Sequence, residues 1–433
     1  MNKKLRSINV LFTFVFCAVS LTAQDFGFDD TGDAVDGGSK SPLAVSISGE
    51  AGTEVLGYVK DFEKAENASL EGGFRGKLNF AAEGANAKGI INLNIKTPNT
   101  NDDFFLSIDE AYLQAYFGDF EIETGIRKLT WGKADSNGPL DVLNPYDYRT
   151  FTNFTNIAEN KIARPMIHPS YRIGSFSKIE AVFLPWFLPH LVLDNGRWSS
   201  FTMPVINPSD DDLKSLKYAG GGARFTTTIG SVDFGVQYFY GRMYIPAITG
   251  FSMVTPTVSG MMLDYNPYHQ VGIDYAGVIA GFNLRAELAA NISSDTGGDD
   301  GAVYNPSIAW SFGFDRDLFW GINLNLQCNE SIRLMNSKVS DNPALDTEAG
   351  RDLTGTRISA VLSKKFLRDD LELNVKGIIG IEDRDYVIVP SIFWTIRDVK
   401  LECSAGVFGG GKDGQFGGYH DNSFVKLGIV YKF

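Results

Sequence analysis

Polar and apolar side chains alternate with a period of two in many short runs of this chain. Around residue 325, four apolar side chains alternate with four polar ones: Ile322, Leu324, Leu326 and Cys328 against Asn323, Asn325, Gln327 and Asn329. The same alternation recurs at residues 91–96, 121–127, 283–291, 399–405 and 424–433. Because successive side chains of a β-strand point to opposite faces, each run predicts a strand with one apolar and one polar face.

The polar face of these predicted strands carries charges of both signs. Its basic residues are Arg75, Lys77, Lys96, Arg127, Arg285, Lys376, Lys400 and Lys426, and its acidic residues are Glu71, Glu121, Glu123, Glu287, Glu372 and Glu402. A water-soluble barrel fills its interior with apolar side chains. A membrane barrel instead turns its apolar face to lipid and can enclose water. The alternation therefore predicts a transmembrane barrel with a wet lumen.

The connections between the predicted strands alternate between short and long from residue 118 to the end. The short ones fall at 118–119, 175–177, 230–231, 280–281, 315–317, 368–370 and 397–398, and the long ones near 130–165, 185–216, 244–266, 293–302, 331–352 and 409–420. Short turns at one end and long loops at the other are typical of outer-membrane barrels. We predict an all-β, antiparallel up-and-down transmembrane barrel of about 18 strands, within a range of about 14–18. Asp109 and Glu110 interrupt the alternation, which could mark a bulge or a misplaced strand.

The N-terminal region has the sequence features of an export signal. Lys3, Lys4 and Arg6 precede an apolar run, and Ala23 offers a small residue for cleavage. This pattern is typical of a secretory signal peptide, so we expect residues 1–23 to be removed. Residues 24–42 then form a short acidic periplasmic tail, and residues 43–433 form the barrel. Removing the signal peptide changes the formal net charge from −13 to about −16. This acidic balance argues against a nucleic-acid partner.

Motifs for catalysis or for metal binding are absent from the sequence. The four histidines are scattered without metal-ligand spacing, and no Gly-x-Ser-x-Gly or phosphate-binding Gly-x-x-x-x-Gly-Lys motif occurs. We therefore predict no enzyme activity, no metal site and no cofactor, although a triad assembled from separate strands would escape this reading. Cys328 and Cys403 both fall on the apolar phase of predicted strands, which favours two small hydrophobic side chains over a disulfide.

The loop near 130–165 holds the candidates for a pore constriction. Its two prolines, its glycines and its bulky aromatic residues favour a loop folded against the barrel over one exposed to water. We expect acidic and basic sides to face each other there, formed by Arg127, Trp131, Asp135, Asp141, Asn144, Asp147, Arg149, Arg164 and Arg172. In the alternative reading, Asp141 and Asn144 only cap local turns.

A second unusual loop, residues 184–208, is strongly apolar for an external connection. Its candidates for contact with an apolar ligand are Trp186, Phe187, Trp198 and Phe201. These side chains either cap the barrel or dip into the outer leaflet, or they form an entry site for a lipid-like or aromatic ligand.

Two groups of residues resemble known proteins. A last strand that ends on Phe433 resembles those of bacterial outer-membrane barrels, whose assembly machinery reads such a terminal signature. Over residues 105–200, the chain resembles a widespread family of uncharacterised outer-membrane barrels. The shared motifs are Glu-Ala-Tyr at 110–112, Gly-x-Arg at 125–127, Trp-Gly-x-x-Asp from 131 to 135 and Asp-x-x-Asn-Pro from 141 to 145. The resemblance implies a bacterial outer-membrane barrel in contact with lipid and with the assembly machinery, but it names no substrate.

These observations lead to one main functional hypothesis and two alternatives. Charges of both signs in the lumen predict a passive, weakly selective channel for small solutes, because single-sign rings are what confer strong selectivity. The first alternative is a transporter of hydrophobic compounds, fatty-acid-like or aromatic, that uses the 184–208 loop. The second is a closed barrel whose surface loops bind a ligand or a host.

Overall fold

The computed structural model describes residues 43–63, 69–97, 105–135, 138–153, 159–193, 195–199, 204–254 and 257–433. The predicted signal peptide at 1–23, the predicted tail at 24–42 and Phe201 lie outside these residues. Within the described ranges, no helix has the length and apolar character needed to cross a membrane.

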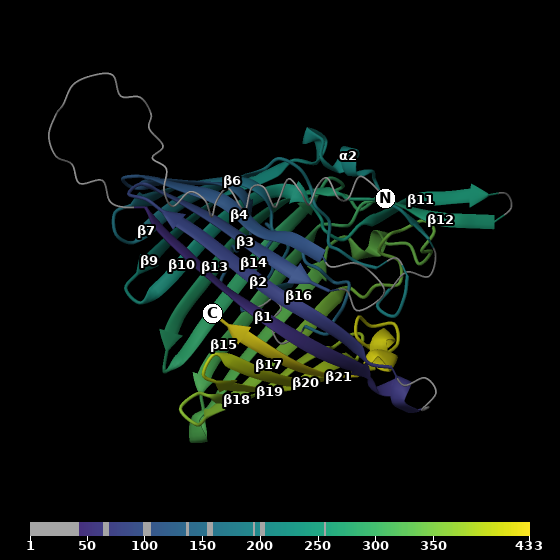
Figure 1. Ribbon diagram of the computed structural model, residues 1–433. Coiled ribbons are helices and arrows are strands. Elements are labelled where there is room, and N and C mark those ends of the chain that lie inside the picture. The colour runs from purple at the N-terminus through teal and green to yellow at the C-terminus, as the bar shows by residue number, and fades with distance from the viewer. Residues whose placement is uncertain are drawn as a thin grey trace, which may run out of the picture. The chain divides into compact units, whose positions relative to one another are not determined.

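Eighteen strands form one antiparallel sheet. They are β1 (Ala44–Tyr58), β2 (Glu71–Glu83), β3 (Ala87–Lys96), β4 (Phe105–Phe117), β5 (Phe120–Arg127), β6 (Arg164–Ile173), β7 (Ser177–Leu184), β9 (Gly220–Ile229), β10 (Val232–Arg242), β13 (Pro267–Ile279), β14 (Phe282–Ser293), β15 (Ser307–Asp317), β16 (Ile322–Arg333), β17 (Thr354–Phe366), β18 (Leu371–Gly380), β19 (Asp385–Ile396), β20 (Val399–Gly410) and β21 (Phe424–Lys432). Strands that follow one another in the sequence lie side by side (Figure 1).

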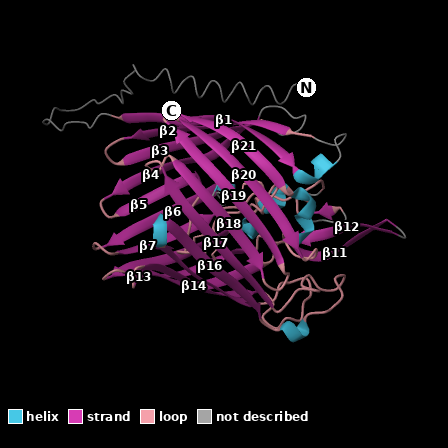
Figure 2. Ribbon diagram, turned by 90° about the horizontal axis from the view of Figure 1, so that it is seen from below, coloured by secondary structure: helices cyan, strands magenta, loops and turns pink. Residues whose placement is uncertain are grey.

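Pairing between the first and last strands closes the sheet into a barrel. β1 aligns antiparallel with β21 from Glu50 opposite Lys432 to Tyr58 opposite Phe424, and Figure 2 shows these two strands as neighbours. Because the number of strands is even, β1 begins and β21 ends at the same end of the barrel, where the short turns lie. The predicted fold class and the predicted number of strands are confirmed.

The two faces of each strand have the predicted character. On β21, Leu427, Ile429 and Tyr431 are about half exposed on the outside, whereas Lys426 and Val430, on the alternate phase of the strand, are buried inside. An apolar exterior suits lipid, and a second face with paired charged side chains suits a wet interior. For example, Arg75 on β2 and Glu402 on β20 form an ion pair of 2.6 Å.

The structure also locates the interruption at residues 109–110. Asn92 aligns with Glu110 and the next residue, Leu93, aligns with Ile108, so Asp109 has no cross-strand partner. This is a β-bulge, one of the two predicted possibilities.

Two turn predictions are wrong in detail. The turn placed at 315–317 lies at 318–321, because β15 continues through Asp317. The alternation of short and long connections also has an exception: β18 and β19 are joined by residues 381–384 alone, at the end where the other connections are long. In this turn, Glu382 accepts hydrogen bonds from the hydroxyls of Thr354 and Thr356 on the neighbouring strand β17.

The long connections contain the remaining elements. They are the strands β8 (Val205–Ile206), β11 (Ala247–Val254) and β12 (Thr257–Asp264) and the helix α2 (Asp210–Leu213). Four 3-10 helices also lie there, at Val59–Glu63, Leu216–Tyr218, Asn336–Lys338 and Gly417–Asn422. A further 3-10 helix, Phe319–Gly321, lies in a short connection. The hairpin of β11 and β12 projects beyond the strands of the barrel (Figure 1).

Candidate functional site

The connection between β5 and β6, residues 128–163, is bound to the inner wall of the barrel. The backbone N–H groups of Lys133, Ala134 and Leu140 donate to the carboxylate of Glu287 at 2.5, 2.6 and 3.2 Å. Glu287 lies near the middle of β14 and is buried. Hydrogen bonds to a carboxylate are about twice as strong as neutral ones. This residue therefore anchors Lys133, Ala134 and Leu140 inside the barrel.

Buried amide side chains on further strands complete this anchor. Gln237 on β10 donates to the carbonyl of Leu140 at 3.0 Å, and Gln270 on β13 donates to the carbonyl of Pro139 at 2.9 Å. Gln327 on β16 accepts the backbone N–H of Asp135 at 2.9 Å. The wall thus supplies the backbone of the loop with the polar partners that it would otherwise find in water.

Charged groups of the same segment pair with the far wall. The Asp135 carboxylate accepts from Arg285 on β14 and from Asn325 on β16, both at 2.6 Å. Arg285 also pairs with Asp315 at 2.6 Å, and Lys133 pairs with Asp233 on β10 at 3.1 Å. The sequence predicted that Asp135 would face Arg127, Arg149, Arg164 or Arg172. The structure corrects this, because the loop reaches β14 and β16 rather than staying beside β5 and β6.

The later part of the loop contacts the other side of the barrel. Glu159 pairs with Lys77 on β2 at 3.2 Å. Lys426 on β21 donates to the carbonyl of Thr152 at 3.1 Å and to the side chain of Asn153 at 2.8 Å. The loop therefore touches the wall on both sides of its origin at β5 and β6.

The other two predicted aspartates pair within the loop itself. Asp141 accepts from Lys161 at 2.7 Å and from the Tyr146 hydroxyl at 2.7 Å. Asp147 accepts two hydrogen bonds from the Arg149 guanidinium, at 2.9 and 2.7 Å, and one from the Arg149 backbone N–H at 3.1 Å. Burial opposes ionisation of Asp147, but the bonds and the charge of Arg149 outweigh it and lower the pKa of this carboxyl below its usual value. Lys161 was not predicted as a partner, since nothing in its sequence surroundings marks it.

The predicted arginines do not gather at one site. Arg127 pairs with Glu123 on its own strand. Arg164 is buried and donates to the carbonyl of Trp186 and, at 3.1 Å, to the hydroxyl of Tyr244. Arg172 lies near the short-turn end of β6 and is exposed, so it is too far along the strand to face the loop.

The base of the loop is fixed by the motif residues. The Asn144 side chain donates to the carbonyls of Arg127 and Ile162, both at 2.9 Å, and accepts from the Leu129 backbone at 2.8 Å. It thereby joins the start and the end of the loop. Trp131 is buried. Gly125 has a φ of 140°, and a Cβ there would lie 2.3 Å from the Ala111 carbonyl oxygen, so only glycine fits.

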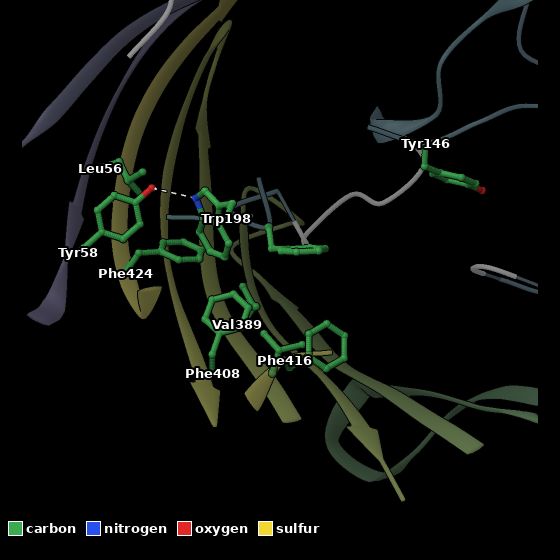
Figure 3. Packing of buried hydrophobic residues seen from close by; sticks show 10 residues of the cluster. Leu56, Tyr58, Tyr146, Trp198, Val389, Phe408, Phe416 and Phe424 are labelled. Carbon is green, nitrogen blue, oxygen red and sulfur yellow. Dashed lines mark hydrogen bonds between the residues drawn. The ribbon is translucent and has the colours of Figure 1, made fainter. Parts of the chain in front are cut away.

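The apolar loop at 184–208 also crosses toward the opposite wall. Trp198 packs in a cluster with Tyr58, Phe408 and Phe424, which come from β1, β20 and β21 (Figure 3). Its indole N–H donates to the Tyr58 hydroxyl at 3.2 Å. The neighbouring Arg197 pairs with Asp61 at 2.8 Å. These contacts fix residues 195–199 of the loop at the long-loop end of the lumen.

Two of the predicted ligand residues of this loop, Phe187 and Trp198, pack in different clusters. Phe187 is buried in a separate cluster with Leu213, Tyr218 and Tyr265, whereas Trp186 is only partly buried. In the described residues, Phe187 and Trp198 therefore have different packing partners, and both are covered by the protein.

His190 connects the two loops. Its Nδ1 accepts the backbone N–H of Tyr146 at 2.9 Å. Its ring stacks on Tyr244 with centroids 4.7 Å apart and meets the edge of Tyr148 at 5.0 Å. Burial among these rings disfavours the imidazolium form and lowers the pKa of His190 to about 4. The imidazole is therefore neutral near pH 7.

Comparisons with known proteins support the fold. No protein-family model and no curated protein matches the chain. Among solved structures it is similar to a BenF-like porin from Pseudomonas fluorescens Pf-5, with 8% identity and a TM-score of 0.50 over 90% of this chain and 98% of the porin. It is also similar to OccAB3 of Acinetobacter baumannii, with 10% identity and a TM-score of 0.49 over 89% of this chain and 99% of OccAB3. A third similar structure is the outer membrane channel DcaP of the same organism, with 12% identity and a TM-score of 0.45 over 92% of this chain and 99% of the channel.

The class of protein follows from these features. The chain forms a closed transmembrane β-barrel with a porin-like fold. Its apolar exterior belongs in a membrane, and even-stranded antiparallel barrels with short turns at one end are those of the bacterial outer membrane. The resemblance of residues 105–200 to an uncharacterised family is not confirmed by these comparisons. In the described part of the chain, no group of three or more His, Cys, Asp or Glu residues is arranged to hold a metal ion.

Proposed function

We propose that this protein is a passive outer-membrane channel for small solutes, without enzyme activity, and that the loop at 128–163 forms its constriction. The supporting observation is the bonding of the 133–140 segment to Glu287 and to three buried glutamines inside an 18-strand barrel. Barrels of about 16–18 strands are too wide for their own side chains to fill and leave an aqueous channel. A loop held inside such a barrel narrows the channel.

The charges around this loop support weak selectivity. Asp135 is balanced by Arg285, Lys133 by Asp233, and Asp141 by Lys161. Strong ion selectivity needs a ring of one sign. Alternating pairs instead create local fields that orient a polar solute and discriminate little between cations and anions.

The burial of the apolar loop supports a covering role for it. Phe187 and Trp198 are already buried against other side chains of the protein, in two different clusters. They hold the long connections together at the end where solutes would enter.

Planar lipid bilayers test the proposal. The purified barrel, shown to be folded by its heat-sensitive migration on a gel, should produce uniform conductance steps, and detergent alone should produce none. Uncharged polymers of increasing size should stop entering the channel at one size, which measures the constriction. A folded barrel that inserts and never conducts would contradict the channel and favour the surface-binding alternative.

A further inference from the structure

The turn between β15 and β16 exposes three large apolar side chains at the short-turn end of the barrel. Leu318 is 41% exposed, Phe319 is 85% exposed and Trp320 is 84% exposed. Trp320 also has a φ of 61°, a left-handed conformation that is uncommon for a bulky residue. Adjacent apolar side chains that stay this exposed mark a contact with a membrane or with another protein.

Two cations lie on the outer face of the strands beside this turn. Arg316 on β15 and Lys364 on β17 have the same phase as the exposed side chains of Phe312 and Leu362. Both cations align with residues among the first three of β16, so they flank this strand next to the turn. Near the short turns, the outward phase of the described strands carries no other charged side chain.

Each of these cations is held over an aromatic ring. The guanidinium carbon of Arg316 lies 4.2 Å from the centroid of the Phe282 ring, and Nζ of Lys364 lies 4.9 Å from that of Phe366. Within the described ranges, neither cation makes a hydrogen bond or an ion pair with the protein. A guanidinium has five N–H donors and an ammonium has three. These donors are therefore left for groups outside the chain.

The nearby carboxylates do not pair with the two cations. Asp315 and Asp317 face the lumen, where Asp315 pairs with Arg285 at 2.6 Å and Asp317 accepts from Asn323 at 2.9 Å. The turn after β17 holds two further aspartates, at 369–370, and these form no ion pair with either cation. The outer face beside the β15–β16 turn therefore carries positive charge without a carboxylate partner.

We infer that this surface, formed by Arg316, Phe319, Trp320 and Lys364, docks anionic phospholipids of the periplasmic leaflet. Short turns face the periplasm in outer-membrane barrels, so the two cations lie at that edge of the lipid-facing band. Cations near a membrane surface attract anionic headgroups, and tryptophan favours the same interfacial layer. Because lipid covers the outward phase of these strands, a lipid fits this surface better than a soluble protein does. The inference does not depend on conduction through the lumen.

Native mass spectrometry of the folded barrel tests the lipid preference. From micelles with equal amounts of phosphatidylglycerol and phosphatidylcholine, the wild type should retain more phosphatidylglycerol. R316Q/K364Q should lower the ratio of the two bound lipids on the order of fivefold. The matched control, R172Q/K365Q, removes the same two types of side chain from the lumen face near the short turns. It should leave the ratio unchanged.

Three results of this experiment would overturn the inference, provided that heat-sensitive migration on a gel shows each variant to be folded. The first is equal retention of both lipids by the wild type. The second is an unchanged ratio in R316Q/K364Q. The third is an equal loss in the two double variants, which would mean that net charge alone attracts the lipid.

The depth of Trp320 in the membrane provides a second test. The chain has six tryptophans, so the emission of Trp320 is measured as the part that W320F lacks. In phosphatidylglycerol vesicles, lipids brominated near the headgroup should quench this part, and acrylamide in the water should quench it little. If acrylamide quenches it and brominated lipids do not, the turn extends into water, where a soluble protein could bind it, and the inference fails.

Discussion

At the scale of single residues, Glu287 binds the inner loop through three backbone N–H groups. Each hydrogen bond to a charged group contributes about 1.5–3 kcal/mol, and Glu287 accepts three from residues 133, 134 and 140. We expect E287A to free this segment, which would raise the mean single-channel conductance and its fluctuation. E372A, which removes a carboxylate from the lumen face of β18, should leave both unchanged. Identical conductance traces for E287A and the wild type would show that Glu287 does not hold the loop.

His190 gives the contact between the two loops a dependence on pH. Its folded pKa of about 4 lies below the value of about 6.5 for an unfolded chain. The stabilisation from the neutral ring is therefore complete above about pH 6.5 and is lost as the pH falls toward 4. A protonated Nδ1 can no longer accept the bond from the Tyr146 backbone N–H. We expect the protection of this amide against hydrogen exchange, corrected for the intrinsic rate, to fall over this range.

The matched variant is H190Q, whose side-chain oxygen accepts a hydrogen bond but does not titrate. Its Tyr146 protection should stay constant between pH 7 and pH 4. Constant protection in the wild type would mean that His190 does not control this contact.

The sequence could place residues on a face of the wall but could not identify their partners. Glu287 was assigned correctly to the lumen face from alternation alone. Its binding to the loop was not predictable, because periodicity carries no information on which distant segment covers a given side chain. For the same reason, Asp135 was matched with arginines close in the sequence, whereas its partner Arg285 comes from the other side of the barrel.

At the scale of strands, a charge introduced on the apolar face should destabilise the barrel, whereas a charge introduced on the polar face should not. Leu288 lies in the middle of β14 and is 45% exposed on the outside. L288R should destabilise the barrel by about 2–4 kcal/mol, because it places a cation at the bilayer midplane. Asn283 lies inside on the same strand and bonds to Asp315, so N283R should be nearly neutral. Equilibrium unfolding in lipid vesicles measures both. Equal losses would mean that both faces contact lipid.

The loop segment 195–199 depends on one buried ring. Trp198 is 6% exposed, and removal of a buried tryptophan side chain costs about 3–5 kcal/mol. We expect W198S to detach this segment, so that an added protease cleaves near it much faster. W186S, at a partly buried position of the same loop, should change the rate little. Equal cleavage of both variants would show that Trp198 is not the anchor.

Strands were predictable wherever one face meets lipid and the other meets water, because this contrast creates the alternation. The elements inside the long connections lack such a contrast. The hairpin of β11 and β12 has no lipid face, and its sequence shows no regular alternation, so it was read as loop. The turn at 381–384 was not predicted because it has only four residues, whereas the other connections at this end of the barrel are long.

At the scale of the whole molecule, closure of the barrel and filling of the lumen have different origins. Closure follows from backbone pairing, since unpaired strand edges cannot face lipid, and this requirement made the even number of strands predictable. The lumen is partly occupied by a few long loops, whose polar groups bond to side chains of the wall and whose apolar groups pack against it. The inward course of the 128–163 loop was expected from its bulky residues, whereas the contact of 195–199 with β1 and β21 was not.

The single-channel conductance of a variant lacking residues 133–143 tests the central claim most directly. This deletion removes the segment bound to Glu287 and leaves all 18 strands intact. If the segment narrows an open lumen, the folded variant should conduct more than the wild type and should admit larger uncharged polymers. Unchanged conductance and an unchanged size limit in a folded deletion variant would contradict the claim that this loop forms the constriction.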